Sequence, residues 1–428
     1  MGKLDETSNL LALYAHHVGK SNTPQEFHLW AALAGIAACV ADRVGLEVIP
    51  GRPLAPNLYV MLIGPSAAGK GMAINKIAEY IEKTPCVAPL IGKVSGMGVI
   101  DYLAEQSTLT ERASSPDHVD KTKLFLGMAE LSFSIGEGPV ADQFIKTMTE
   151  LYDSTGTHFY ERTRTGGTHK FKKPNITWLA GTTMEWLMTS ITGDQIMSGF
   201  FGRTCAVISQ GVKHQLIAPV LPPDYQEVAQ HIQERFIRLS HLRGVFTRTH
   251  RAHEVEKAWF YGLQPNGQPG MEPFEGRQHM LSLKLAMLLS LADGENLVID
   301  AHHMAMAQTL VDKLRVTLPK LIDYAFSLGD VKPTRVVENL LQRAGEMPKY
   351  MLVNKARRLG IPAYRLEEAL NTLVQEKLIE KFTVSPKAHA PQVAYRRVKR
   401  DIFAQILKDV PPEDDETEEA ADEYGNNQ

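Results

Sequence analysis

The chain has 428 residues, 44% of them apolar and 22% charged, with a formal net charge of −3 at pH 7, which is the composition of a globular protein of two or three domains. Its three cysteines, Cys39, Cys86 and Cys205, form no Cys-x-x-Cys pair, and this spacing excludes a disulfide framework or a cysteine zinc site. The longest apolar run, residues 29–41, predicts a buried helix and is too short to span a bilayer, so we expect a cytoplasmic protein without membrane contact.

Residues 1–50 predict a helical lead-in, in which NLLALYAHHV and PQEFHLWAALAGIAACVADRV have helical spacing and the strand-like GLEVIP follows. An α/β core is predicted over residues 51–212, where NLYVMLIGP, KLFLGMAEL, NITWLAGTT and RTCAVIS are the runs expected to form buried strands. Residues 213–330 are predicted to be mostly helical. There, His302 and His303 should point about 100° apart on a helix, which argues against a shared metal ion.

Residues 331–400 predict a separate domain, three short helices followed by the strand-like IEKFTV and VAYRRV, in the order of a winged helix. This segment carries 15 Lys and Arg against 6 Asp and Glu, whereas residues 401–428 carry 10 acidic residues against one Lys. The acidic segment has too few apolar side chains to fold, so we expect a disordered tail. The tail could compete with DNA for the basic surface, recruit another replication protein, or act only as a solubilising segment.

The stretch GPSAAGKG, residues 64–71, has the glycines and the lysine of a phosphate-binding loop (P-loop) between a predicted strand and a predicted helix. Glycines let backbone N–H groups turn onto phosphate oxygens, and Lys70 would neutralise the β- and γ-phosphates at the helix N-terminus. A structural glycine turn is the alternative interpretation. The residues expected to bind the nucleotide are Gly64, Pro65, Ser66, Ala67, Ala68, Gly69, Lys70, Gly71 and Met72.

Two residues that usually bind Mg²⁺ in such proteins are absent. The Ser or Thr expected after the lysine is replaced by Gly71, and the acidic pair expected at the end of the second strand is Ala129-Glu130. Glu130 remains to orient the attacking water and to bind Mg²⁺ through a water, although a solvated acid is the alternative. Either ATP is hydrolysed with Mg²⁺ held mainly by the phosphates, or the site binds nucleotide with slow hydrolysis or none.

The order of GPSAAGKG, FLGMAEL, ELYDSTGTHFYERTRTGGTHKFKKPNITWLAGTT, SGFFGR and EGRQHMLSLKLAMLLSLA resembles a P-loop NTPase domain of phage and mobile-element primase-helicase proteins. It is also distantly similar to the AAA+ modules of superfamily 3 and minichromosome-maintenance helicases. The resemblance spans about residues 25–315 and fails at Gly71 and Ala129. It implies an AAA+ or RecA-like core with a helical lid, ATP and Mg²⁺ as cofactors, a bacterial host cell, and a homo-oligomeric ring, for example a hexamer.

The same resemblance implies roles for four further residues. Thr182 and Thr183 are placed as polar sensors of the γ-phosphate, and Arg203 as an arginine finger for the ATP of the neighbouring subunit. Arg277, at the start of the lid, would be a second sensor that contacts the nucleotide. Fixed cations stabilise the charge that develops on a transferred phosphoryl group. For each arginine, a role as an ordinary surface residue is the alternative.

Two basic segments are candidates for DNA contact. Residues 159–174 predict a β-hairpin around Thr-Gly-Gly-Thr, and in the helicases that the chain resembles such a hairpin follows one DNA strand in the ring channel. In the predicted winged helix the contacts would be to duplex DNA, with ring assembly as the alternative. A solvated surface is the alternative for the hairpin. The candidate residues are Arg162, Arg164, His169, Lys170, Lys172, Lys173, Lys355, Arg357, Arg358 and Arg365.

These features predict an ATP-dependent DNA helicase or replication-initiation motor of a phage or mobile element. The alternative from another class is a nucleotide-gated DNA-binding switch, such as a loader, a packaging factor or a regulatory factor. A small-molecule kinase is a third option, disfavoured by the predicted winged helix and by the absence of a Thr after Gly71.

Overall fold

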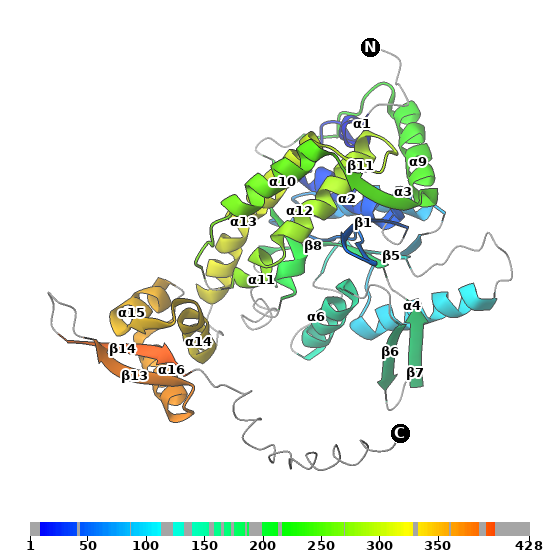
Figure 1. Cartoon of the computed structure of the whole chain (residues 1–428). Helices are drawn as coiled ribbons and strands as arrows, with labels where there is room; N and C mark the ends of the chain where they lie inside the picture. Colours follow the sequence, from blue (N-terminus) through cyan, green and yellow to red (C-terminus); the bar gives the residue numbers. More distant parts are fainter. Residues whose placement is uncertain are drawn as a thin grey trace, which may run out of the picture. The chain divides into compact units, whose positions relative to one another are not determined.

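The computed structural model describes residues 9–40, 43–85, 87–112, 123–131, 139–153, 158–163, 167–172, 175–184, 186–187, 199–212, 216–268, 270–327, 333–358, 361–384 and 391–398. The chain divides into two compact units, one over the residues up to Lys332 with Arg358–Ile361, and one over Pro333–Arg357 and the residues from Pro362 onward (Figure 1). Among the described residues, every helix is too short or too polar to cross a membrane.

A five-stranded parallel sheet forms the centre of the first unit, in the order β4-β5-β8-β3-β9. Strands β3 and β5 are buried along their whole length and β8 and β9 nearly so, because helices cover the sheet; their sequences are therefore continuous apolar runs rather than alternating ones. The four predicted strands are confirmed, whereas the edge strand β4 is not predicted by the sequence. The strands are β3 (Tyr59–Ile63), β4 (Ala88–Ile91), β5 (Lys123–Met128), β8 (Asn175–Thr182) and β9 (Thr204–Ile208).

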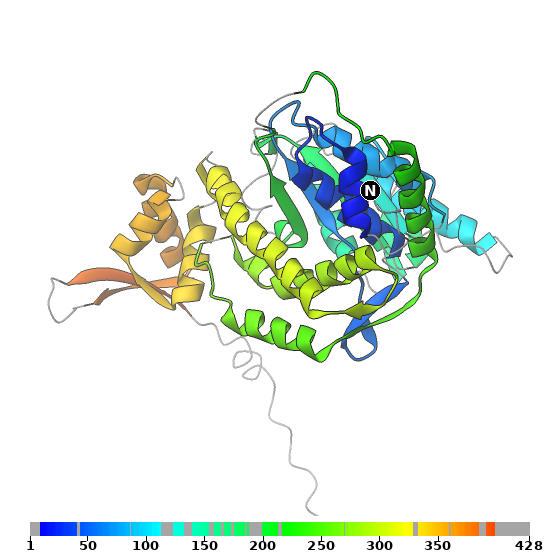
Figure 2. The ribbon, with the colours of Figure 1, turned by 90° about the horizontal axis from the view of Figure 1, so that it is seen from above.

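Helices α2 (Gln25–Val40) and α3 (Lys70–Glu82) pack against each other and against this sheet (Figure 1). Helix α2 is buried along almost its whole length, which confirms the buried helix predicted from its apolar run. The two helices approach most closely at Gly35, where an added Cβ would lie 2.7 Å from Ile77 Cδ1. Helices α1 (Leu10–Val18) and α9 (Tyr225–His241) lie beside α2 (Figure 2).

The segment predicted to be mostly helical contains two strands that the sequence does not predict. They join a second sheet in the order β11-β10-β1-β2, in which β10 pairs in parallel with β1, the strand predicted from GLEVIP. The strands are β1 (Val44–Ile49), β2 (Arg52–Leu54), β10 (Gly244–Arg248) and β11 (Val298–Ile299), and the remaining helices are α10 (His250–Gly262), α11 (Glu272–Glu275), α12 (Gln278–Asp293) and α13 (Ala301–Ser327).

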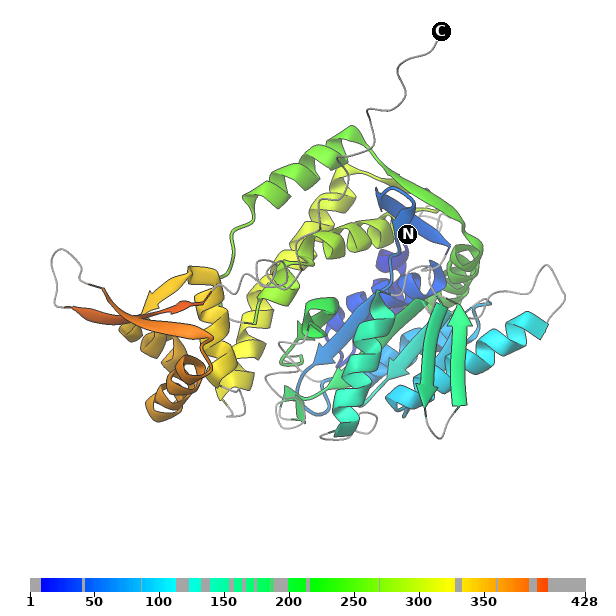
Figure 3. The same cartoon turned by 60° about the horizontal axis from the view of Figure 1, so that its bottom comes forward.

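The predicted hairpin is confirmed as the antiparallel pair β6 (His158–Thr163) and β7 (Gly167–Lys172). It is anchored by Phe159 and Phe171, which are buried and stack with ring centroids 4.8 Å apart. It lies beside α4 (Gly96–Arg112), and α6 (Pro139–Tyr152) is the other helix of this part of the unit (Figure 3).

The second unit contains the three short helices and the two strands that the sequence predicts, together with a short strand, β12, that it does not. The strands form an antiparallel sheet in the order β12-β14-β13. The elements are α14 (Pro333–Ala344), β12 (Glu346–Pro348), α15 (Lys349–Arg358), α16 (Ala363–Gln375), β13 (Ile379–Val384) and β14 (Gln392–Arg397). The predicted acidic tail, residues 401–428, lies outside the described residues.

Candidate functional site

The P-loop joins the carboxyl end of β3 to the first turn of α3. Gly69 caps α3 in the left-handed conformation with φ 79°, and no side chain caps the helix. The first N–H groups of a helix have no partner within the helix and carry a partial positive charge. This helix terminus can therefore receive an anion, and the loop leading into it supplies further backbone N–H groups.

The shape of the loop depends on Gly69. Thr23, which precedes α2, donates a hydrogen bond of 3.4 Å from Oγ1 to the Gly69 carbonyl oxygen. A Cβ added to Gly69 would lie 2.8 Å from Thr23 Cα, and its positive φ is unfavourable for other residues. The segment before α2 thus holds the loop from one side.

Lys70 lies in the centre of the site. Its side chain is buried and Nζ donates hydrogen bonds to the carbonyl oxygens of Gly64 (2.9 Å) and Pro65 (2.7 Å). The ammonium group of Lys70 therefore lies against the P-loop, on the side where phosphate oxygens would bind. A buried ammonium needs such oxygen partners because its desolvation is costly.

The ends of β5 and β8 reach the same site. The backbone N–H of Gly64 donates to Thr182 O (3.2 Å), and that of Leu131, next to Glu130, donates to Gly181 O (2.7 Å). Glu130 is half-buried. The predicted catalytic residues Glu130, Thr182 and Thr183 therefore lie at one edge of the sheet with Lys70.

The two threonines have local hydrogen bonds. Thr182 Oγ1 donates to Thr183 O (3.3 Å), and Thr183 Oγ1 accepts from the Trp186 backbone N–H (3.2 Å). Thr182 is fully buried and Thr183 half-buried. Thr183 is therefore the better placed of the two to contact a ligand at the surface of the site.

The residues around the P-loop do not fit Mg²⁺ well. Magnesium binds oxygen ligands in octahedral geometry, and P-loop proteins usually supply a hydroxyl and a carboxylate. Gly71 and Ala129 occupy those two positions and carry no side-chain oxygen. Glu130 is the remaining predicted carboxylate ligand.

The two predicted arginines lie at the opposite edge of the sheet. Arg203 directly precedes β9, whose first residue, Thr204, pairs with Tyr59 at the start of β3, whereas the P-loop follows Ile63 at the end of β3. Four residues of strand separate these edges, about 13 Å. Burial lowers the pKa of Arg277, and the nearby charge of Arg203 adds to this effect. Arg277 thus belongs to the Arg203 edge and lies away from the P-loop of its own chain.

Sequence analysis misses two charged residues at this edge. Asp153 Oδ2 accepts hydrogen bonds from Nε (3.0 Å) and Nη2 of Arg203. Lys284 Nζ is buried, donates to Asn57 Oδ1 (2.7 Å), and lies 4.1 Å from the ring centroid of Tyr152. Burial lowers the pKa of Lys284 to about 7, although Asp153 opposes the shift. The sequence signal that could have indicated Lys284 is its position as a single lysine within the apolar run of α12.

The basic candidates for DNA contact fall in both units. Arg162, Lys170 and Lys172 are on the strands of the hairpin, and His169 Nε2 lies 3.5 Å from Asp101 Oδ1 of α4. In the second unit Arg357 and Arg365 are exposed and Lys355 is half-buried. Arg358 is the last residue of α15. Arg164 and Lys173 lie outside the described residues.

A cavity of about 920 Å³ lies between α1, α2, the end of β9 and α13. It borders the P-loop region, because Ile208 pairs with Ile63 directly before the loop and Gln25 follows Thr23 by two residues. Its walls are mainly apolar. The lining residues include Leu11, Ala15, Gln25, Leu29, Ile208 and Leu310.

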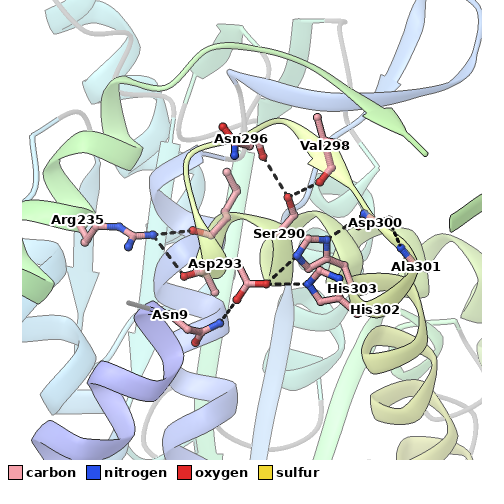
Figure 4. A network of polar contacts seen from close by, with 12 residues as sticks. Asn9, Arg235, Ser290, Asp293, Asn296, Val298, Asp300, Ala301, His302 and His303 are labelled. Atoms are coloured by element: carbon pink, nitrogen blue, oxygen red, sulfur yellow. Dashed lines mark hydrogen bonds and ion pairs between the residues drawn. The ribbon is translucent and has the colours of Figure 1, made fainter. Parts of the chain in front are cut away.

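His302 and His303 converge, although the sequence predicts that they diverge. Nε2 of each ring lies 2.9 Å from Asp293 Oδ2, and both rings turn toward this carboxylate (Figure 4). His303 Nδ1 accepts the backbone N–H of Asp300 (3.0 Å), so the proton of a neutral His303 is on Nε2 and is donated to Asp293. This tautomer has no free Nε2 lone pair, which disfavours a shared metal ion and favours a structural tie between α12 and α13.

Comparison with known proteins finds remote similarity to solved structures. No family model matches the chain, and no curated protein matches it. The crystal structure of a full-length MCM homolog from Methanopyrus kandleri is similar with a TM-score of 0.38 and 12% sequence identity. The match covers 72% of this chain and 59% of that chain, so this chain corresponds to less than two thirds of that protein.

Proposed function

We propose that this chain binds ATP at the P-loop and hydrolyses it to drive movement on DNA, as an oligomer in which each nucleotide lies between two subunits. The observation that supports this proposal best is the convergence of Lys70, Glu130 and Thr183 at one sheet edge while Arg203 lies at the other. Because about 13 Å of strand separates the two edges, a contact of Arg203 with a nucleotide would be with the nucleotide of another copy.

The chemistry follows from the side chains. Lys70 and the N-terminus of α3 bind the phosphates, and Glu130 orients the attacking water. Arg203 and Arg277 of a second copy stabilise the negative charge on the transferred phosphoryl group. Magnesium, when bound, offsets phosphate charge and is held mainly by the phosphates themselves, since Gly71 and Ala129 supply no oxygen.

The cavity between α1, α2 and α13 is proposed to take the nucleobase. It adjoins the P-loop, and its apolar walls suit a flat aromatic ring.

DNA is the proposed partner of the hairpin β6–β7 and of the second unit. Basic side chains on the hairpin would follow a single strand, and Arg357 and Arg365 would contact duplex phosphates. With the resemblance described above, this assembly corresponds to a helicase or initiation motor in phage or mobile-element replication.

A nucleotide-gated switch is the second candidate. The pair Gly71 and Ala129 favours it, because a site that lacks two of the usual protein oxygen ligands for magnesium can bind nucleotide and hydrolyse it slowly. In that case ATP would control DNA binding without being turned over at a useful rate.

The test measures nucleotide binding by calorimetry, phosphate release with and without single-stranded DNA, and particle mass with nucleotide. Lys70→Ala should abolish nucleotide binding, whereas Lys83→Ala, at the exposed residue that follows the same helix, should have no effect. Glu130→Gln should bind ATP normally but release phosphate at least about 10² times more slowly than the wild type.

Two results would contradict the proposal. If Lys70→Ala binds ATP as the wild type does, the P-loop is a structural turn. If the wild type binds ATP but releases no more phosphate than Glu130→Gln, with or without DNA, the chain is a switch and not a motor.

A further inference from the structure

We propose that Asp153 is a positioning residue: it orients the Arg203 guanidinium so that Arg203 can act on the nucleotide of a neighbouring subunit. This inference rests on the proposed function, because it assigns Arg203 to a second copy. It adds to the machinery of hydrolysis the residue that directly follows α6, which neither sequence motif nor strand order indicates.

The hydrogen bonds of Arg203 support this role. Asp153 Oδ2 accepts from Nε (3.0 Å) and from Nη2, and the Gly199 carbonyl accepts from Nη1 (3.0 Å). A guanidinium has five N–H donors, and these contacts use three of them. One N–H on each terminal nitrogen therefore remains without a partner among the described residues, and these two donors can bind two phosphate oxygens.

The packing around the pair fixes the arginine in one orientation. The Arg203 side chain is 11% exposed, and its Cζ lies 5.8 Å from the ring centroid of Tyr152, the residue before Asp153. Asp153 itself is 57% exposed and lies at the end of α6. The Asp153 carboxylate thus contacts Arg203 from the solvent side. The Tyr152 ring and the Gly199 carbonyl contact Arg203 from the protein side. Preorganisation of this kind reduces the entropy lost when a ligand binds.

The Asp153 carboxylate also reduces the repulsion between the positive charges at this edge of the sheet. Arg203 and Arg277 are cationic side chains grouped near Asp153, and the charge of Arg203 acts on Arg277. Asp153 offsets the repulsion between them and leaves an excess of positive charge. That excess suits a phosphate chain.

A cavity gives access to the pair. It has a volume of about 390 Å³ and is lined by Ile145, Lys146, Thr149, Glu150, Asp153 and Arg203. The residues other than Arg203 come from α6, from Ile145 onward, and from the position that follows it. A second copy could therefore present its nucleotide to Arg203 from this side without unfolding α6.

The experiment measures ATP turnover of the full chain, with calorimetry of ATP binding. Arg203→Ala should lower kcat by about 10³-fold, as for other trans-acting arginines. Asp153→Asn should lower kcat by about 10- to 100-fold with KM and ATP affinity unchanged, because a misplacement of about 1 Å has costs of this size. Asp153→Glu should recover most of the loss. The control Glu82→Gln removes an exposed carboxylate at the end of α3 and should behave as wild type.

Mixed oligomers separate positioning from a structural role. A Lys70→Ala subunit binds no ATP but still carries an intact Arg203, whereas an Asp153→Asn subunit has an intact P-loop. Mixing the two proteins should raise turnover above that of Asp153→Asn alone, because the Asp153→Asn P-loops then receive Arg203 from the Lys70→Ala subunits. Mixing Arg203→Ala with Lys70→Ala should restore it in the same way.

Each outcome decides the matter. Recovery of turnover in both mixtures supports the positioning role. Recovery with Arg203→Ala but not with Asp153→Asn, or wild-type kcat in Asp153→Asn, overturns the inference and leaves the proposed function intact. A wild type that turns over no ATP overturns both.

Discussion

Gly71 and Ala129 face each other across the P-loop site: a Cβ added to Gly71 would lie 3.7 Å from Ala129 Cβ. They come from the first turn of α3 and from the residue directly after β5. The two positions that lack a metal ligand therefore line opposite sides of the same small space. A Ser at position 71 would fit in ordinary van der Waals contact, since the backbone there has no positive φ.

The double variant Gly71→Ser with Ala129→Asp tests what this space does. We expect the Mg²⁺ concentration needed for half-maximal ATP binding to fall about tenfold, because a hydroxyl and a carboxylate become available as ligands. With saturating Mg²⁺, kcat should change less than about threefold, since Glu130 and Arg203 already supply the chemistry. Titration of Mg²⁺ at fixed ATP measures the first quantity. A much larger rise in kcat would favour the nucleotide-gated switch.

Gly69→Ala should destabilise the P-loop by about 2 kcal/mol or more and abolish ATP binding, because it combines a positive φ with a clash against Thr23. Gly51→Ala is the matched control. Gly51 has φ 73° and no atom within 4 Å of an added Cβ, so it carries only the backbone penalty, about 1 kcal/mol. Chemical denaturation measures both. Equal losses in the two variants would mean that Thr23 does not constrain the loop.

Lys284 should make stability depend on pH. Its pKa in the folded state is about 7 against 10.5 when exposed, so between these values the unfolded chain holds more protons than the folded chain. The free energy of unfolding should therefore rise with pH across this range, by up to about 1.4 kcal/mol per pH unit, and the penalty should be largest below pH 7. Lys284→Met should remove this contribution to the slope.

Urea denaturation at several pH values between 6.5 and 9.5 checks the Lys284 prediction. The slope is the readout, because Lys284→Met also leaves the buried Asn57 Oδ1 without its donor and lowers stability at every pH. The exposed Lys320→Met is the control and should keep the wild-type slope. The same slope in wild type and Lys284→Met would show that Lys284 stays charged in the folded chain.

Ala15→Trp should fill the cavity beside α1 and weaken ATP binding about tenfold, since overpacking of a site costs about 1–3 kcal/mol. Ala15 is exposed, so the melting temperature should not change. Ala12→Trp, on the same helix but outside the cavity lining, is the control. Calorimetry with ATP and with free triphosphate distinguishes the base from the phosphates. Unchanged ATP affinity in Ala15→Trp would remove the nucleobase from this cavity.

The double variant Lys355→Ala with Arg357→Ala should weaken binding of duplex DNA and reduce the slope of log affinity against log salt by about 2. Fluorescence anisotropy at several salt concentrations measures this slope. Arg251→Ala with Lys257→Ala, on the exposed side of α10, removes the same charge from the first unit and should leave it unchanged. Equal effects of the two pairs would indicate a nonspecific response to net charge.

The sequence by itself determined the elements whose signals are local. The strand, glycine loop and helix around Lys70 follow from a buried apolar run, from residues that tolerate a left-handed turn and from helical spacing. The hairpin around Thr-Gly-Gly-Thr follows from alternation and turn chemistry. The sequence also placed Glu130 and Thr182 at the ends of two predicted strands, KLFLGMAEL and NITWLAGTT.

Only the tertiary structure decided which distant residues meet. Asp153 and Arg203 are 50 positions apart and pair because α6 ends beside the first residues of β9. Strand β10 forms because β1, about 200 residues earlier, offers it an edge. His302 and His303 converge on Asp293 because the turn between α12 and α13 brings that carboxylate between their ring nitrogens. Such contacts depend on helix rotation and strand register, which are set by packing of the whole unit and leave no periodic signal in the chain.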